Sequence, residues 1–411
     1  MPTRRNFLKS SLGTSAVLAA APTVPQLVAL TANAASAVKR SHQERILVVV
    51  QLSGGNDGLN TVVPFADPQY AKNRIALRLQ PDAVHKLDGE VGLHPSMKTF
   101  AKLFEAGRLT VVQGVGYPNP DRSHFSSMDV WHTAQRDVTK QQEGWLGRYA
   151  GIAEHRASRG TDSAALHLGG NVLPLALVGR DTAVPSIATL EGFRLRGDAA
   201  ALASQERAAS TTRPDAGDML GFLQRTTLGA FASSRRVQEA LSKQRTSATY
   251  PDRGLARQLQ TVAQLIDADL ATSVYYVSLD GFDTHANQQA SHAALLGELA
   301  DSVSAFTADL AERGHLDRTC VLMFSEFGRR VKENASLGTD HGAAAPLFVA
   351  GGKLKSGVVG KHPSLERLDR EGDLAFHTDF RSVYAALLQD WLGVESQSVL
   401  GADFKRLPLF A

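Results

Sequence analysis

The sequence has a single cysteine, Cys320, among its 411 residues. One cysteine excludes a disulfide within the chain and a zinc site built from four cysteines. Cys320 also lies far from the N-terminus, which excludes lipid attachment at a cysteine behind an export signal. The chain therefore has to hold its fold together without covalent cross-links of its own.

The sequence also has little excess charge. Its formal net charge is +3, and residues 1–34 contribute Arg4, Arg5 and Lys9 without any acidic residue. The rest of the chain is therefore neutral, and it contains no long basic run. Because affinity for nucleic acid comes mostly from neutralised phosphates, nucleic-acid binding is not expected.

Residues 1–37 have the make-up of a cleavable export signal. The run Thr-Arg-Arg-Asn-Phe-Leu-Lys at residues 3–9 resembles the twin-arginine signal, in which paired arginines precede an apolar pair and often a lysine. A mildly apolar stretch from Leu12 to Leu30 follows, with small-x-small cleavage sites at residues 32–34 and 35–37. Two prolines in this stretch argue against a membrane-spanning helix, so we predict a signal that is removed.

The predicted signal implies a partner and a location. We expect the twin-arginine translocase to be a partner during export, and the mature protein to be periplasmic or extracellular. No second segment is long and apolar enough to span a membrane, so no stable span is expected after cleavage. The lack of disulfides fits a chain that finishes folding before it is exported.

Strand-like and helix-like segments alternate through residues 43–411. Residues 45–52 read Arg-Ile-Leu-Val-Val-Val-Gln-Leu, and such a continuous β-branched run predicts a strand buried on both faces of a parallel sheet. Further strands are predicted at residues 109–115, 273–279, 319–324 and 346–350. Helices are predicted at residues 95–107, 123–134, 217–245, 254–270, 289–313 and 379–392. The alternation predicts an α/β fold, with a doubly wound, mostly parallel central sheet and helices on both faces.

Residues at about 150–250 differ from this pattern. Short strand-like pieces at residues 164–168 and 173–178 are separated by glycine and proline, and an alanine-rich polar stretch follows at residues 198–215. We interpret the region as an insertion or cap within one large α/β domain, which also fits the length of the chain.

Carboxylates and imidazoles gather just after the predicted strands. In open α/β sheets, a site forms beyond the carboxyl ends of the strands. The residues at these positions are Asp57, Ser123 with His124, Asp283 with His285, Glu326, and Asp340 with His341 shortly before the strand at 346. Oxygen ligands suit hard cations and imidazole suits zinc, iron or manganese, so the set predicts a divalent metal site.

Simpler structural roles also fit three of these residues. Asp57 lies in an Asn-Asp-Gly run that favours a turn, and Ser123 is a good N-cap residue. Glu326 could instead be a buried partner of Arg329 or Arg330.

Five motifs resemble those of the domain of unknown function 1501 family, whose members often carry twin-arginine signals. They are Leu-Ser-Gly-Gly-Asn-Asp-Gly-Leu-Asn at 52–60, Arg-Ser-His-Phe at 122–125, Asp-Thr-His at 283–285, Ser-Glu-Phe-Gly-Arg at 325–329 and Gly-Thr-Asp-His-Gly at 338–342. The resemblance extends from about residue 44 to residue 411. The family in turn resembles the alkaline phosphatase and sulfatase superfamily.

This resemblance implies a role for each site residue. An aspartate after the first strand of the superfamily matches Asp57, and a nucleophile that opens a helix matches Ser123, with Ser126 as the alternative. Paired ligands of one metal match Asp283, or Asp280 in its place, and His285. The implied ligands are Asp283, His285 and His341 for one metal, and Asp57, Glu326 and Asp340 for a weaker second position. The metal is expected to be zinc, manganese or calcium, and Arg122 is expected to bind a substrate oxyanion.

The resemblance predicts an exported, metal-dependent hydrolase of phosphate or sulfate esters that acts on a small ester with a serine nucleophile. Two departures support an alternative. Phe327 stands where the superfamily has a histidine ligand, and the residues after Ser123 lack the motif for formylglycine formation. The alternative is an exported binding or assembly protein that has lost catalysis on the same scaffold.

Overall fold

The computed structural model describes residues 45–156 and 247–411 without a gap. Between them it describes residues 163–170, 172–180, 182, 184–188, 198–210, 227–228, 231 and 234–235. The predicted signal at residues 1–37 and most of the predicted helix at 217–245 lie outside these ranges. No helix in the described ranges combines the length and apolar character needed to cross a membrane.

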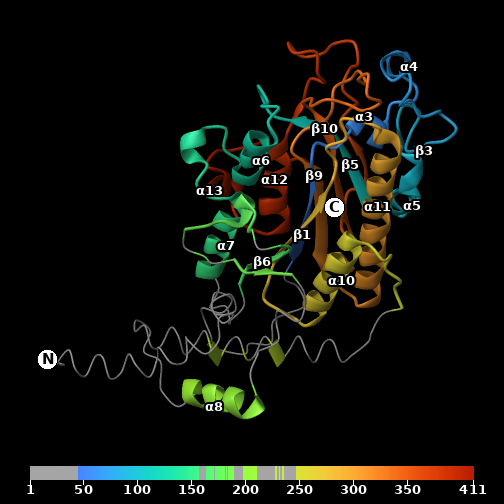
Figure 1. The fold of residues 1–411 in the computed structure, drawn as a ribbon. Coiled ribbons are helices and arrows are strands. Elements are labelled where there is room, and N and C mark those ends of the chain that lie inside the picture. Colours follow the sequence, from blue (N-terminus) through green and yellow to red (C-terminus); the bar gives the residue numbers. More distant parts are fainter. Residues whose placement is uncertain are drawn as a thin grey trace.

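A large, mostly parallel sheet forms the centre of the molecule (Figure 1). Its strands are β1 (Ile46–Ser53), β5 (Leu109–Gly116), β6 (Ala165–Leu168), β7 (Ser186–Ile187), β8 (Val274–Asp280), β9 (Thr319–Ser325), β10 (Ala345–Gly351), β11 (Gly357–Val359) and β12 (Thr378–Asp379). They lie in the order β11-β5-β10-β9-β1-β8-β6-β7, and β12 pairs with β5. Among the strands in the described residues, only β10 pairs antiparallel with its neighbours in this sheet, β5 and β9. The fold class predicted from the alternating pattern is confirmed.

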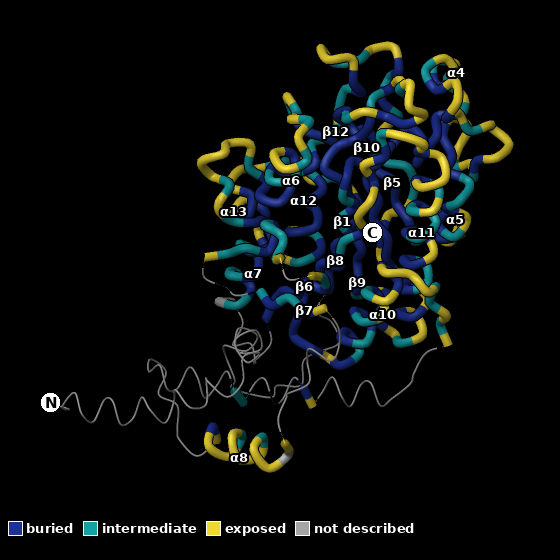
Figure 2. Tube along the Cα trace, viewed as in Figure 1, coloured by how far each residue is buried: buried dark blue, intermediate teal, exposed yellow. Residues whose placement is uncertain are grey.

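Helices cover both faces of this sheet. On one face lie α5 (Lys98–Glu105), α10 (Gly254–Asp267) and α11 (Gln288–Glu312); on the other lie α6 (His124–Thr133), α7 (Trp145–Arg156) and α12 (Phe380–Ala386). Burial on both faces of the sheet explains why the sequence of strand β1 is continuously apolar. Val48 and Val50 pack into the core on one face, and Leu47 and Val49 pack into the core on the other. Figure 2 shows this strand buried within the molecule.

Shorter elements surround the central layers. They are α3 (Gly58–Thr61), α4 (Pro68–Asn73), α8 (Ala199–Ser210), α13 (Ser396–Leu400), the 3₁₀ helices Pro95–Met97, Val138–Lys140, Leu175–Leu177 and Leu316–Arg318, and the π-helical turn Leu387–Trp391. Strands β2 (Val62–Val63), β4 (Gly92–Leu93) and β3 (His85–Lys86) form a small separate sheet.

The described part of the region at about 150–250 adds strands to the central sheet. Strand β6 pairs with β8, and β7 pairs with β6, so both extend the edge of the central sheet. The strand predicted at residues 173–178 is wrong, because residues 175–177 form a 3₁₀ turn that starts after Pro174. Most of the remainder of this region lies outside the described residues, and its role as a cap stays a prediction.

Candidate metal centre

Four parallel strands deliver the candidate residues to one edge of the sheet. Strands β1, β5, β8 and β9 have their carboxyl ends at this edge. Strand β10 runs in the opposite direction, so its amino end lies there too. This reversal explains why His341 reaches the site from a position before its strand, while Asp283 and His285 follow theirs.

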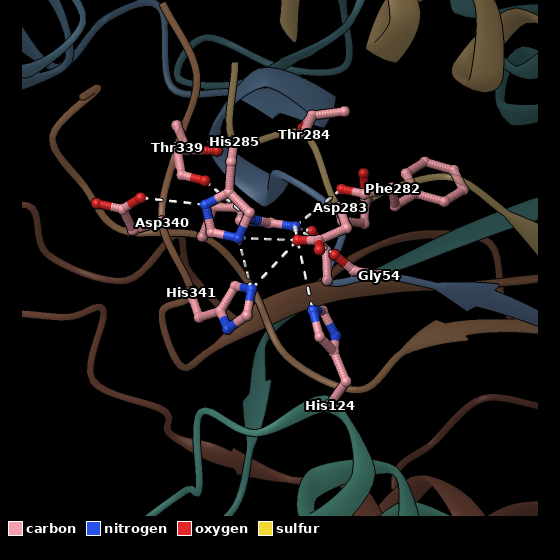
Figure 3. A network of polar contacts seen from close by, with 12 residues as sticks. Gly54, His124, Phe282, Asp283, Thr284, His285, Thr339, Asp340 and His341 are labelled. Atoms are coloured by element: carbon pink, nitrogen blue, oxygen red, sulfur yellow. Dashed lines mark hydrogen bonds and ion pairs between the residues drawn. The ribbon is translucent and has the colours of Figure 1, made fainter. Parts of the chain in front are cut away.

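Three imidazoles converge on one carboxylate oxygen (Figure 3). The Oδ1 atom of Asp283 lies 3.0 Å from Nε2 of His285, 3.2 Å from Nε2 of His341 and 3.4 Å from Nε2 of His124. Ligands of a tetrahedral zinc ion with bonds of about 2.0–2.1 Å stand about 3.3 Å apart. The three distances to Asp283 are close to this value, and one ligand atom each of His124, Asp283 and His341 lie within 4.8 Å of one another, while His285 contacts the latter two.

The second ring nitrogen of each imidazole faces a hydrogen-bond acceptor. Nδ1 of His124 lies 2.8 Å from Oε1 of Glu326, and Nδ1 of His285 lies 3.1 Å from Oδ1 of Asp340. Nδ1 of His341 lies 2.7 Å from the backbone carbonyl oxygen of Arg122. Because carboxylates and carbonyls only accept, each Nδ1 carries a proton, and each ring that is neutral therefore presents a lone pair at Nε2.

This donor set fits a metal ion. Ligating histidines usually donate their other ring N–H to a carboxylate or a backbone carbonyl, and all three rings do so here. Nε2 of His124 is buried and has no hydrogen-bond partner among the described residues. Three nitrogen lone pairs and one carboxylate oxygen suit zinc or manganese; calcium prefers a shell of oxygen ligands.

One side of the cluster is open to solvent. The side chains of Asp283 and His285 are 48% and 44% exposed, whereas those of His124 and His341 are 29% and 21% exposed. A metal ion at this position would therefore be reachable from outside, as a catalytic centre requires.

Arg329 holds the central carboxylate in place. Its guanidinium is fully buried and donates to Oδ1 of Asp283 over 2.6 Å, and also to the backbone oxygens of Gly55 and Thr339. Burial alone would raise the pKa of Asp283, but the hydrogen bonds from Arg329 and His341 outweigh it and lower the pKa to about 2. Asp283 is therefore ionised over the whole neutral range.

The conformation of Gly54 shows why the turn after β1 requires glycine. Its φ angle is +117°, and a Cβ atom there would lie 2.4 Å from the backbone nitrogen of Asp283. Its N–H donates to Oε1 of Glu326 over 2.9 Å. Only glycine permits both the left-handed backbone and this close approach, so the turn brings the loop after β1 against the loop of Asp283.

Glu326 lies behind His124. Its Oε1 atom accepts from Gly54 and His124, and its Oε2 atom lies 2.9 Å from the hydroxyl of Ser325. The carboxylate is buried, which raises its pKa, but the hydrogen bond from His124 and those from the backbone leave the pKa below its usual value. Glu326 therefore contacts the Nδ1 side of the His124 ring, while Oδ1 of Asp283 lies on the Nε2 side.

Asp57 does not reach the cluster. It is fully buried, and Arg74 donates to both of its carboxylate oxygens, at 2.5 Å and 2.8 Å. Gln288 donates to Oδ2 over 2.5 Å. The ion pair with Arg74 outweighs burial and lowers the pKa of Asp57. Glu326 contacts His124 and Asp340 contacts His285, so the three carboxylates expected at a second metal position each meet a different protein donor in this structure.

Arg122, Ser123 and Ser126 lie at the start of α6. The Arg122 guanidinium donates to Oδ2 of buried Asp373 over 2.5 Å and 3.0 Å, and its side chain remains 30% exposed. Ser123 is exposed and directly precedes α6, and its side chain makes no capping hydrogen bond. Ser126 is exposed one position before buried Ser127.

His124 is one of the residues that gather after the predicted strands, but neither expected ligand set includes it, and Arg74 has no expected role. His124 had a usable signal, because it follows a strand and opens a helix within the Arg-Ser-His-Phe motif at residues 122–125. Arg74 had none, since it lies 17 residues beyond Asp57 at the end of a short helix.

The chain matches the family described as Protein of unknown function (DUF1501) over residues 44–391. None of the curated proteins matches it.

Several solved structures are similar to this chain at low identity. Lipooligosaccharide phosphoethanolamine transferase A from Neisseria meningitidis, an integral membrane protein, is 11% identical with a TM-score of 0.36, covering 85% of this chain and 55% of that one. The C-terminal periplasmic domain of EcEptC from Escherichia coli, in complex with Zn, is 10% identical with a TM-score of 0.35, covering 75% and 73%. A protein in the alkaline phosphatase superfamily from Vibrio parahaemolyticus is 7% identical with a TM-score of 0.33, covering 83% and 71%. The chain thus spans about half the length of the first of these proteins. At such identities and TM-scores, no function passes from them to this chain.

Proposed function

We propose that this chain, which belongs to the DUF1501 family, is a hydrolase of phosphate or sulfate esters that depends on one bound divalent metal. The observation that carries the proposal is the convergence of three imidazole Nε2 atoms on Oδ1 of Asp283, at 3.0 to 3.4 Å. Asp283 and His285 are on the exposed side of this cluster, from which a small ester would approach.

The metal would be zinc or manganese, held by His124, Asp283, His285 and His341. When bound, it would supply a Lewis acid that neutralises negative charge on an ester oxygen. The chain itself orients the ligands: Glu326, Asp340 and the Arg122 carbonyl hold the three Nδ1 protons, and Arg329 holds Asp283.

Ser123 is the proposed nucleophile. It directly precedes the ligand His124, its hydroxyl is free of any capping bond, and it lies at the positive end of helix α6. In the proposed reaction its Oγ forms a bond to phosphorus or sulfur, the ester alcohol leaves with a proton, and water then releases the acid. Arg122, tethered by Asp373, supports the proposal as a nearby guanidinium for a substrate oxygen.

The test is metal analysis of the purified protein together with turnover of an aryl phosphate, an aryl phosphodiester and an aryl sulfate. We expect close to one metal ion per chain and hydrolysis of at least one substrate. Ser123→Ala should remove turnover and keep the metal, whereas Ser126→Ala, its neighbour on the same helix, should retain turnover. A protein that stays inert to all three substrates after zinc and manganese have been added would refute the proposal.

A second candidate is a binding or assembly protein that keeps the metal and has lost catalysis. Two observations favour it. The Phe327 ring packs 4.9 Å from the rings of both His124 and His341, at the position where the superfamily resemblance implies a histidine ligand. The second observation is that Arg74 forms an ion pair with Asp57, the carboxylate that the resemblance implies as a ligand of a second metal. This candidate predicts one metal per chain and no turnover, with Ser123→Ala leaving the biological role unchanged.

Export by the twin-arginine route is part of the proposal. The paired Arg4 and Arg5 support it, and so do the small-residue cleavage sites before residue 38. Replacing both arginines with lysine keeps the charge and should leave the precursor inside the cell, as fractionation and immunoblotting would show. Normal export of this variant would contradict the assignment.

A further inference from the structure

We infer that Gln288 is a positioning residue that sets the distance between the two loops carrying His285 and His341. The inference rests on the proposed metal centre. Gln288 is the first residue of α11, and its side chain is buried between the loop after β8 and the loop before β10.

The Gln288 amide joins these loops through two threonine hydroxyls. Its Oε1 atom accepts from the hydroxyl of Thr284 over 3.1 Å and from that of Thr339 over 2.6 Å. Thr284 directly precedes His285, and Thr339 directly precedes Asp340 and His341. One amide oxygen therefore connects the backbone next to both ligand-bearing positions.

The other end of the amide is anchored in the core. Nε2 of Gln288 donates to Oδ2 of Asp57 over 2.5 Å, and Asp57 accepts from Arg74 through both of its oxygens. Arg74 is held in turn by the backbone oxygens of Arg330 and Val331. A buried ion pair thus fixes the position of Gln288.

The polarity of this chain of hydrogen bonds is fixed at every step. The Arg74 guanidinium can only donate, and the ionised Asp57 carboxylate can only accept. The Gln288 amide therefore has to turn its nitrogen, which donates, toward Asp57. Its oxygen must then face the threonines, whose hydroxyls have to donate. Thr284, Thr339 and Gln288 are all at most 6% exposed, so water cannot easily replace a lost partner.

Replacement of Gln288 should therefore lower the metal affinity more than it lowers the stability of the fold. A backbone hydrogen bond from Thr339 N–H to Thr284 O also joins the two loops, so loss of Gln288 loosens the spacing of His285 and His341 without separating the loops, and the metal-binding geometry is formed less often. Outer partners of metal ligands typically contribute about 10- to 100-fold in affinity.

The experiment measures zinc affinity by chelator competition, and the absorption spectrum of the Co²⁺-loaded protein, for four variants of the full mature chain. Gln288→Met removes the amide at similar volume, Thr339→Val removes one donor, and Thr339→Ser keeps it. Thr307→Val, which removes a buried hydroxyl of α11 that bonds to Ser304, serves as the control.

We expect zinc affinity to fall about 10-fold or more for Gln288→Met, and several-fold for Thr339→Val, with a changed Co²⁺ spectrum in both. Thr339→Ser and Thr307→Val should bind like the unmodified protein. Equal affinity and an unchanged spectrum in Thr339→Val would overturn the inference even if Gln288→Met fails to fold. A loss in Thr307→Val equal to that in Thr339→Val would also overturn it, because the effect would then be general. If the unmodified protein binds neither zinc nor Co²⁺, the metal centre itself fails.

Discussion

The Nε2 atoms of His285 and His341 lie 2.9 Å apart, although the Nδ1 atom of each ring already faces an acceptor. Two neutral rings in this arrangement would direct lone pairs at each other. The contact therefore needs a cation between the rings, either a proton or a metal ion. Oδ1 of Asp283 lies near both nitrogens and supplies the negative charge that either cation would meet.

Zinc binding should therefore release protons. If a proton bridges the two rings in the metal-free protein, zinc has to displace it. Calorimetry at neutral pH in two buffers of different ionisation enthalpy should give different apparent binding enthalpies, and a chelator should lower the melting temperature. Apparent enthalpies that do not depend on the buffer would show that no proton is exchanged.

His124→Ala should weaken zinc binding by more than 100-fold, because it removes a ligand rather than a supporting partner. The neighbouring Phe125→Ala provides a matched control, since Phe125 is 85% exposed. Competition with a chromogenic chelator would measure both. Tight zinc binding by the His124→Ala variant would remove His124 from the ligand set.

Glu326→Gln should weaken zinc binding about 10-fold while the fold is retained. The Glu326 carboxylate is the main reason that the pKa of His124 lies above its usual value, so its replacement with a neutral amide should lower that pKa. An NMR titration of the His124 ring in the metal-free protein would measure the change. A pKa that stays the same, or rises, would mean that Glu326 does not control the charge of His124.

The strand pattern could be predicted because each buried strand is a continuous apolar run. The turns that follow carry the polar residues, so these residues could be gathered at one edge of the sheet from their positions, and the family resemblance then narrowed them to Asp283, His285 and His341. The partners of Asp57 and Glu326 could not be predicted in the same way. A carboxylate after a strand has the same local sequence whether it meets a metal, a guanidinium or an imidazole, and Arg74 reaches Asp57 only through the folded position of α4.

Breaking the ion pair between Asp57 and Arg74 should destabilise the fold strongly. Both side chains are fully buried, and removal of one partner leaves a buried charge without compensation, which typically costs 3–5 kcal/mol, to order of magnitude. Asp57→Ala should therefore lower the free energy of unfolding in urea by about this amount, and the double variant with Arg74→Met should lower it less. Because Asp57 anchors Gln288, zinc affinity should also fall, but by no more than in Gln288→Met. A fall of more than 100-fold in a stable Asp57→Ala protein, as expected for a lost ligand, would restore Asp57 as a ligand.

His292 should make the stability of the metal-free protein depend on pH. Its side chain is buried beside Asn56, and burial lowers its pKa from 6.5 to about 4 despite the opposing charge of Asp57. Between these values the unfolded chain binds a proton that the folded chain does not. His292 therefore contributes no penalty above pH 6.5, and stability is lost as the pH falls from 6.5 toward 4.

The loss attributable to His292 should be on the order of 2 to 3 kcal/mol at pH 4 relative to pH 7. Urea unfolding in excess chelator at several pH values would measure it, and the chelator separates it from proton competition for the metal. His292→Gln removes the titrating ring, so the stability of this variant should fall less steeply over the same range. Other buried histidines, such as His132 with a pKa also lowered to about 4, contribute to the same acid loss. The difference between the two proteins, rather than the whole slope, therefore isolates His292. Parallel curves for the two proteins would assign the acid sensitivity to those other groups.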